Sequence, residues 1–290
     1  MTQDILVTGG NGRLGMALAR QGCRALPRDR MDITDPVQLA SVLEQRQPSC
    51  VINAAAYTAV DHAEDESDNA HRVNAAGAGL LARLCAAASI PLIQISTDMV
   101  FSKADPDSPL PEKTWPEPDS VYGASKLEGE TLVRQAGGPH LIARVSWLFD
   151  REGESFVSKI LGAGLQRDTL KLVEDEHGRP TPADDLAAKL IILAGYLERG
   201  DPLPPVLHLG PPVPVSRYGW AQHIFETAER LGHRVPTLEP VSSSQFKTPA
   251  NRPLGVVLDV SLADSLLGPM PDWKPSCEEV VRHALDSWAS

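Results

Sequence analysis

The chain has 290 residues, 42% of them hydrophobic, and a formal net charge of −11 at pH 7. This length suits one large domain, or a large domain with a smaller one. The acidic balance argues against general binding to nucleic acid or to a membrane surface, although a local site can still be positive. The four cysteines are scattered, which argues against a disulfide framework and a structural zinc site.

The N-terminal segment, Met1–Val7, has no basic region followed by an apolar run, so it shows no signal-peptide pattern. The longest apolar run, Leu186–Leu197, contains Lys189 and is too short to span a bilayer. We therefore expect a cytoplasmic protein.

The first elements follow a nucleotide-binding pattern. Ile5–Thr8 reads as a short buried strand, and a glycine-rich turn and an amphipathic helix follow it. In this context Gly9 permits a tight turn, Gly12 lets a pyrophosphate approach the backbone, and Gly15 lets helix and strand pack closely. The spacing is G-x-x-G-x-x-G, and a turn without a ligand is the alternative. The predicted cofactor-binding residues here are Gly9, Asn11, Gly12, Arg13 and Leu14.

The next strand, Cys23–Leu26, ends near Arg28. An acidic residue at this place binds the ribose hydroxyls in NAD-preferring sites, whereas an arginine suits a 2′-phosphate. Arg28 therefore favours NADPH, with NADH as the alternative. Asp32 and Ile33 are predicted to hold the adenine edge and face. Thr34 or Asp35 suits a helix N-cap, with Pro36 in the first helical position, and the two interpretations are compatible.

Two further strands end in residues that suit a cofactor cleft. Val51–Asn53 runs into Ala54, Ala55, Ala56 and Tyr57, and the small side chains leave room for ribose and phosphates. Pro91–Asp98 ends in two hydroxyls, Ser96 and Thr97, and a carboxylate. Ligands of a doubly wound sheet lie beyond the carboxyl ends of its strands, so these tips face one crevice. Asn74, polar amid alanines of the long helical stretch Asp65–Ala88, is expected to bond backbone across to a strand and to be structural, with an indirect catalytic role as the alternative.

Tyr122 and Lys126 are four residues apart at the start of a helical pattern, which puts them on one helix face. An ammonium beside a phenol favours its ionised form, so we expect the pKa of Tyr122 to lie below its ordinary value. Such a phenol exchanges a proton with a carbonyl or alcohol oxygen while hydride moves to or from nicotinamide. Lys126 also suits the nicotinamide ribose. The alternative is a chance spacing with an exposed lysine.

Strand and helix patterns alternate through residue 150, which predicts a parallel, doubly wound sheet of the Rossmann type in residues 1–150. In residues 151–290 helical patterns are separated by proline-rich joints, which predicts a smaller α/β substrate lobe. The segment Leu207–Gly210 is expected to return to the main sheet.

The motifs together resemble the extended branch of the short-chain dehydrogenase/reductase superfamily, and more narrowly the dTDP-4-dehydrorhamnose reductase family. The resemblance covers nearly the whole chain. It rests on Asn53–Asp61, Ser96–Phe101, Tyr122–Glu130, Arg144–Trp147, His177–Thr181, Asp185–Ala187, Arg252–Pro253 and Leu258–Asp259, which follow the family's order.

The resemblance implies a catalytic triad of Thr97, Tyr122 and Lys126, with Thr97 polarising the carbonyl. It implies that Trp147 lines the sugar pocket and that Arg252 meets the substrate's diphosphate; a surface ion pair is the alternative for Arg252. Met99 stands where the family usually has a tyrosine, and a thioether cannot donate a hydrogen bond to the sugar. Some members bind magnesium, but we find no ligand cluster and predict no metal site.

The expected function is reduction of the 4-keto group of a dTDP-linked 6-deoxy sugar, dTDP-4-dehydro-L-rhamnose above all. The first alternative, motivated by Met99, is a reductase for another keto-sugar of an antibiotic or surface-glycan pathway. The second is a non-catalytic regulatory subunit that keeps the fold and binds cofactor. A homodimer is compatible with the sequence, and the metal requirement stays open.

Overall fold

A parallel six-stranded sheet forms the framework of the molecule. The structure is a computed structural model and describes residues 4–289; residues 1–3, part of the segment tested for a signal peptide, lie outside it. The strand order is β10-β5-β4-β3-β1-β2. The strands are β1 (Ile5–Thr8), β2 (Arg24–Leu26), β3 (Cys50–Asn53), β4 (Leu92–Thr97), β5 (His140–Val145) and β10 (Val206–Leu209).

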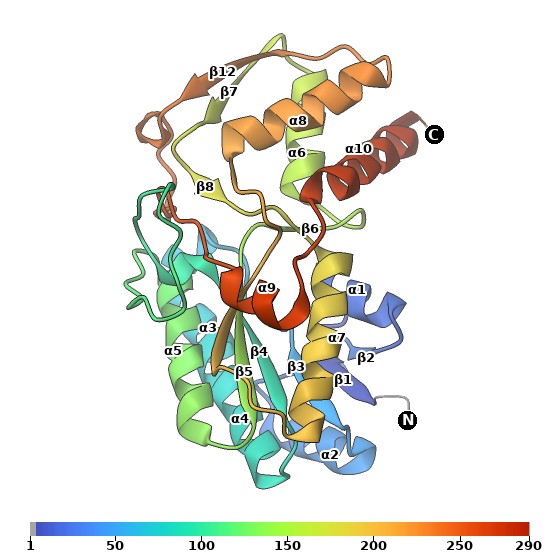
Figure 1. Cartoon of the computed structure of the whole chain (residues 1–290), viewed down its shortest axis with the longest axis vertical. Coiled ribbons are helices and arrows are strands. Elements are labelled where there is room, and N and C mark those ends of the chain that lie inside the picture. Colours follow the sequence, from blue (N-terminus) through green and yellow to red (C-terminus); the bar gives the residue numbers. More distant parts are fainter. Residues whose placement is uncertain (1–3, 290) are drawn as a thin grey trace.

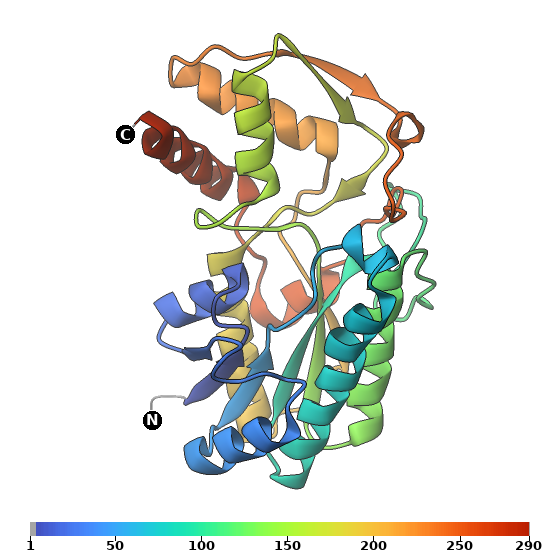
Figure 2. The ribbon, with the colours of Figure 1, turned by 180° about the vertical axis from the view of Figure 1, so that it is seen from behind.

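Helices cover both faces of this sheet (Figures 1 and 2). They are α1 (Arg13–Arg20), α2 (Pro36–Arg46), α3 (Ser67–His71), α4 (Ala78–Ala87), α5 (Val121–Ala136) and α7 (Ala183–Arg199). Side chains alternate along a strand, so on β1 Ile5 and Val7 join the core beneath α1 and α7, while Leu6 joins the core beneath α2 and α4. Burial on both faces explains why most residues of these strands are apolar.

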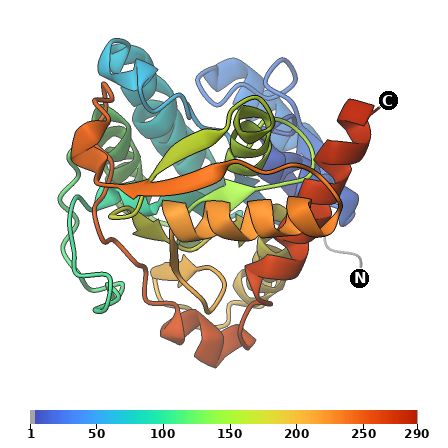
Figure 3. The same ribbon diagram turned by 90° about the horizontal axis from the view of Figure 1, so that it is seen from above.

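A second lobe lies over the carboxyl ends of these strands (Figure 1). Its helices are α6 (Phe156–Leu165), α8 (Arg217–Arg230) and α10 (Trp273–Ala289), and they share a core that includes Trp220 and Trp273. Its small strand pairs are β7 (Thr169–Val173) with β12 (Thr237–Val241), and β8 (His177–Gly178) with β11 (Val215–Ser216). Figure 3 shows α8 and the β7–β12 pair lying across the top of the molecule.

The chain passes between the lobes more than once. β10 pairs with β5 in the main sheet, as expected for Leu207–Gly210. α7 packs on the sheet against α1 rather than with the second lobe's helices. Two short elements, β6 (Leu148–Phe149) and β9 (Thr181–Pro182), pair where the lobes meet, and α9 (Ser261–Leu267) lies beside β10. The division at residue 150 stays a prediction.

The predicted fold class, a parallel doubly wound sheet, is confirmed. Of the two candidate N-caps, Asp35 and not Thr34 caps α2, and Pro36 is in the first helical position as expected. The long helical stretch differs from the prediction, because a π-helical segment, Arg72–Gly77, separates α3 from α4. No helix within residues 4–289 is both long enough and apolar enough to cross a membrane.

One buried ion pair joins α5 to the sheet. Glu130 is fully buried and accepts two hydrogen bonds from Arg144 of β5, at 2.8 and 2.7 Å, and one from Ser96 of β4 at 2.7 Å. Burial alone would raise the pKa of Glu130, but the hydrogen bonds and charge of Arg144 hold it below its ordinary value. The pair therefore stabilises the fold at neutral pH, and this contribution is lost as the pH falls below the ordinary carboxyl range.

We expect Arg144→Met to lower the free energy of unfolding by about 3–5 kcal/mol, because it leaves Glu130 buried without its main partner. Urea denaturation followed by circular dichroism measures this change. The matched control is Arg134→Met, which removes a partly exposed partner of the same carboxylate and should cost about 1 kcal/mol or less. Equal losses of unfolding free energy in the two variants would contradict the view that Arg144 is the main partner of Glu130.

Candidate active site

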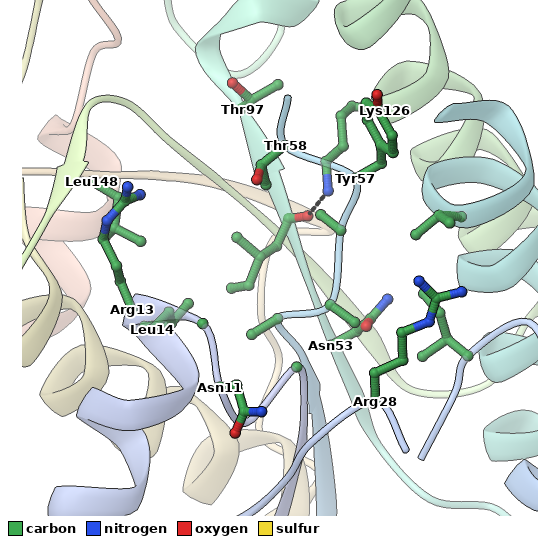
Figure 4. A pocket seen from close by; sticks show the side chains of 18 of the residues that line it. Asn11, Arg13, Leu14, Arg28, Asn53, Tyr57, Thr58, Thr97, Lys126 and Leu148 are labelled. Carbon is green, nitrogen blue, oxygen red and sulfur yellow. Dashed lines mark hydrogen bonds between the residues drawn. The ribbon is translucent and has the colours of Figure 1, made fainter. Parts of the chain in front are cut away.

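A cavity of about 760 Å³ opens at the carboxyl ends of β1, β3 and β4 (Figure 4). Its walls include the glycine turn, the segment after β3, the start of α5 and the segment around Leu148. The cavity brings together most of the predicted site residues, namely Gly9, Asn11, Gly12, Arg13, Leu14, Arg28, Asp32, Ile33, Ala54, Ala55, Ala56, Tyr57, Ser96, Thr97, Tyr122, Lys126 and Trp147.

The glycine turn is shaped by two positions where no side chain fits. Gly9 has a φ of +68°, and a Cβ there would lie 2.8 Å from the Ala55 nitrogen. A Cβ on Gly15 would lie 2.3 Å from the Gly9 oxygen, so α1 starts in contact with the turn. The first turn of α1 lies at the cavity, and the N-terminus of a helix suits a pyrophosphate. The residues present therefore fit a dinucleotide.

Arg28 and Asp32 form the rim at one end of the cavity. Arg28 is exposed and donates from Nε to Asp32 Oδ2 at 3.0 Å. Asp32 Oδ1 accepts from the backbone and the hydroxyl of Thr34, at 2.9 and 2.8 Å. Burial alone would raise the pKa of Asp32, but the hydrogen bonds from Thr34 and Arg28 hold it below its ordinary value. Ile33, which is buried, supplies apolar surface beside this charged pair.

Asn74 has the backbone contacts that we predicted. Its side chain accepts from Tyr57 N at 2.8 Å, donates to Tyr57 O at 3.1 Å and donates to Ser125 at 3.0 Å. A second chain of buried polar groups was not predicted: Thr8 donates to Asn53, which donates to Gln94, while Thr8 accepts from Ala55 N. These bonds fix the segment after β3, where it passes the cavity.

Tyr122 and Lys126 lie on one face of α5, which begins at the N-cap Ser120. Lys126 Nζ donates to the Ile95 carbonyl oxygen at 2.7 Å, the bond drawn in Figure 4. Burial lowers the pKa of Lys126 to about 8, opposed by the charge of Glu130. The lysine therefore reaches the cavity wall beneath Thr97, where its remaining donors can meet a ligand.

The expected lowering of the Tyr122 pKa is wrong. Burial raises the pKa of Tyr122 to about 12, the charge of Asp98 adds to this, and a hydrogen bond with Thr97 opposes it. Lys126 does not counter the effect because its ammonium is directed at Ile95. The phenol is thus protonated at neutral pH, which suits a proton donor.

Neighbouring hydroxyls on β4 point in opposite directions. Ser96 donates to Glu130 on the α5 side, so its hydroxyl is engaged in the core although the residue also lines the cavity. Thr97 donates to Asp98 Oδ1 at 3.0 Å and accepts from Met99 N at 3.2 Å. Side chains alternate along a strand, which explains why these two hydroxyls have partners on different sides of β4.

Trp147 lines both this cavity and a second one of about 380 Å³. It has a φ of +48° and stacks on Trp220 at 5.7 Å between ring centroids. The guanidinium of Arg217 lies 3.7 Å from its ring centroid and contacts Glu176 at 3.5 Å. Burial lowers the pKa of Arg217 to about 10, while the charges of Glu176 and Asp98 oppose this.

Arg252 lines the second cavity and also forms an ion pair. Its two terminal nitrogens contact both carboxylate oxygens of Asp61, at 3.0 and 2.9 Å. Met99 is half-buried in the turn after Thr97 and is not among the residues that line either cavity. Arg217 was missed by the sequence analysis because a single arginine at a helix start carries no distinguishing signal. Within residues 4–289, no group of three or more His, Cys, Asp and Glu side chains is arranged to hold a metal ion.

Comparisons with known proteins support the resemblance seen in the motifs. The family model described as the RmlD substrate binding domain matches residues 2–285. The dTDP-4-dehydrorhamnose reductase of Sinorhizobium fredii is 34% identical, over 96% of this chain and 96% of its own. The enzyme of the same name from Mycolicibacterium smegmatis is 35% identical, over 97% and 86%.

Solved structures agree with these sequences. The crystal structure of dTDP-4-dehydrorhamnose reductase from Bacillus anthracis in complex with NADP has a TM-score of 0.87 and 30% identity, over 97% of this chain and 99% of its own. Because the family model covers nearly all of the sequence and relatives about one-third identical match it end to end, the chain belongs to the dTDP-4-dehydrorhamnose reductase family.

Proposed function

We propose that the protein reduces the 4-keto group of dTDP-4-dehydro-L-rhamnose with NADPH, giving dTDP-L-rhamnose. The observation that carries the proposal is the meeting of Thr97, Tyr122 and Lys126 at one wall of a cavity whose glycine turn suits a dinucleotide. The relatives' names and the NADP in the Bacillus anthracis structure support the substrate and the cofactor.

NADPH, when bound, supplies a hydride to the ketone carbon. Tyr122 gives its phenolic proton to the ketone oxygen as the carbon–oxygen π bond breaks, so the product is an alcohol and the phenolate regains a proton from solvent. The raised pKa of Tyr122 keeps that proton in place until the oxygen becomes basic. Lys126 uses one donor on Ile95 and has others for the nicotinamide ribose hydroxyls.

The proposed cofactor contacts are those of the predicted residues. The glycine turn and the start of α1 bind the pyrophosphate, and Ala54–Tyr57 contact the nicotinamide half of the cofactor. Arg28 at the rim binds the 2′-phosphate, beside Asp32 and Ile33 at the adenine. A guanidinium suits a phosphate dianion in both charge and geometry.

On the substrate side we propose that Trp147 contacts the sugar and that Arg252 contacts the diphosphate. Arg252 lines the second cavity while it is paired with Asp61, so we propose that an ion pair with Asp61 and a contact with the diphosphate are compatible. Residues 151–290 mainly supply the substrate lobe. A homodimer in the cytoplasm remains part of this proposal.

A second candidate is a reductase of another dTDP-linked keto-sugar. Met99 favours it, and so does a relative from Streptomyces antibioticus, 32% identical over 97% of this chain and named a probable dTDP-4,6-dihydroxy-2-methyloxan-3-one 4-ketoreductase. A panel of dTDP-keto-sugars, compared by kcat/KM, separates the two. Cofactor binding without turnover of any keto-sugar would instead favour a regulatory subunit.

We expect Tyr122→Phe to lower kcat by about 100-fold or more, because the ketone oxygen loses its proton donor. The loss of nicotinamide absorbance with dTDP-4-dehydrorhamnose measures the rate, and the NADPH dissociation constant should stay within about threefold. Tyr196→Phe, which changes a tyrosine of α7 beside Arg199, is the matched control and should retain full activity. Full activity of Tyr122→Phe would contradict the proposed role of Tyr122 as the proton donor.

We expect Arg28→Ala to raise the KM for NADPH by about 10- to 100-fold and to leave the KM for NADH within about twofold, since only NADPH has the 2′-phosphate. Arg30→Ala is the control, because Arg30 is exposed in the same loop and does not line the cavity. If both cofactors weaken equally, Arg28 acts on the shape of the loop and not on the phosphate.

A further inference from the structure

The start of α5, which carries Tyr122, is held by a carboxylate from another part of the chain. Glu64 Oε1 accepts from the backbone N–H of Val121 at 2.9 Å. Val121 is the first residue of α5 and comes directly before Tyr122. The first N–H groups of a helix have no partner within that helix, so an acceptor from another segment satisfies one of them and fixes where the helix begins. A negative charge at this end also suits the helix dipole.

The other bonds of α5 lie elsewhere along the helix. The N-cap Ser120 bonds within the same turn, so it moves with the helix and cannot fix it to another segment. Lys126 and Glu130 hold the helix about one and two turns beyond Tyr122. Glu64 therefore adds a fixed point at the end of the helix where the proton donor lies.

Glu64 is the last residue of a short 3-10 turn, η1 (His62–Glu64), and Asp61 comes directly before this turn. Ala63, inside the turn, is fully buried, and its N–H donates to the Ala59 carbonyl oxygen at 2.9 Å. The turn packs against α5. Asp61 and Glu64 are thus the two ends of a compact, seated piece of chain.

The other end of this turn is bound to the segment after β12, residues 250–252. Asp61 accepts from both terminal nitrogens of Arg252, at 3.0 and 2.9 Å, and from Ala250 N at 3.3 Å. The residue between them, Asn251, donates to Asp119 Oδ2 at 3.0 Å, two residues before α5 begins. Residues 250–252 therefore contact both the turn that holds the helix and the chain that leads into it.

We propose that Glu64 is a positioning residue for the proton donor, and that the turn between Asp61 and Glu64 connects residues 250–252 to the start of α5. This inference rests on the proposed function, in which Tyr122 gives its proton to the ketone oxygen. Glu64 acts through Val121 and takes no part in the proton transfer itself. Arg252, the proposed diphosphate contact, lies at the far end of the same series of hydrogen bonds.

Three substitutions of Glu64 separate the position of its acceptor oxygen from its charge. Glu64→Gln keeps an acceptor oxygen at the same reach, Glu64→Asp keeps the charge but is one methylene shorter, and Glu64→Ala removes both. We expect the rate to stay within about threefold of wild type in Glu64→Gln and to fall by about 10- to 100-fold in the other two, because a small misplacement of a reacting group costs that much. The measurement is the single-turnover loss of nicotinamide absorbance, with enzyme and NADPH in excess over dTDP-4-dehydrorhamnose.

The matched control is Glu128→Ala, which removes a more exposed carboxylate of α5 itself, paired with His71, and should react at the wild-type rate. The dissociation constant of NADPH should stay within about threefold in every variant, since the change concerns the proton donor and not the cofactor. An unchanged rate in Glu64→Asp or Glu64→Ala, or a large loss in Glu64→Gln, would overturn the proposal. Melting temperatures show that each variant is folded, and the comparison of Gln with Asp decides the question if the alanine variant is not.

The link to residues 250–252 is tested by a double-mutant cycle of Asp61→Ala and Glu64→Ala, with Glu64→Asp in place of an alanine variant that does not fold. Asp61→Ala alone should lower the single-turnover rate by about 10-fold at saturating enzyme, where a weaker hold on the sugar no longer matters. If Asp61 acts through the turn, the double variant should react within about threefold of the Glu64 variant alone. Losses that multiply, or no loss in Asp61→Ala, would refute this link. If the wild type reduces no keto-sugar at all, the proposed function fails first, and that result differs from every outcome above.

Discussion

The attachment of α5 to the sheet is the constraint on which the site depends. Tyr122, Lys126 and Glu130 follow one another at intervals of four residues, so they occupy one face of the helix at successive turns. Glu130 anchors this face through Arg144 and Ser96, and Lys126 adds its bond to Ile95. At the other end of the helix, a Cβ on Gly123 would lie 2.1 Å from the Met99 oxygen, so glycine lets α5 approach the end of β4 closely. A shift of this helix would move the proton donor and the lysine together.

The sequence was sufficient for those parts of the molecule that local patterns encode. The strand, glycine turn and helix at Ile5–Arg20, the N-cap Asp35 and the spacing of Tyr122 and Lys126 each depend on residues close together in the chain. The Thr8–Asn53–Gln94 chain could not be predicted, because it joins polar groups on three strands whose order only the folded sheet defines. The pKa of Tyr122 was predicted in the wrong direction, since the spacing gave the lysine's position on the helix but not the direction of its ammonium or the burial of the phenol.

Contacts between the lobes explain how an acidic protein can present cations to an anionic ligand. Arg13 at the start of α1 donates to the carbonyl of Glu154 across the cavity, and Arg217 packs on the ring of Trp147. Arg252 is paired with Asp61. Each guanidinium is held by a carbonyl, a ring or a carboxylate of another segment, which limits the side-chain entropy lost when a ligand binds. The net charge of the whole chain therefore says little about the local field in the cleft.

Burial also determines the resting protonation states at this site. Removing a phenol from water disfavours its anion, and removing an ammonium from water disfavours its cation, so the pKa of Tyr122 rises to about 12 while that of Lys126 falls to about 8. A phenol that holds its proton is a poor base for oxidising an alcohol but a ready donor once hydride transfer makes the ketone oxygen basic. The carboxylate of Asp98 strengthens this bias, since its charge destabilises a phenolate beside it. The surroundings of Tyr122 thus keep it in the protonated form that a proton donor needs, and a cation placed against the phenol would lower its pKa.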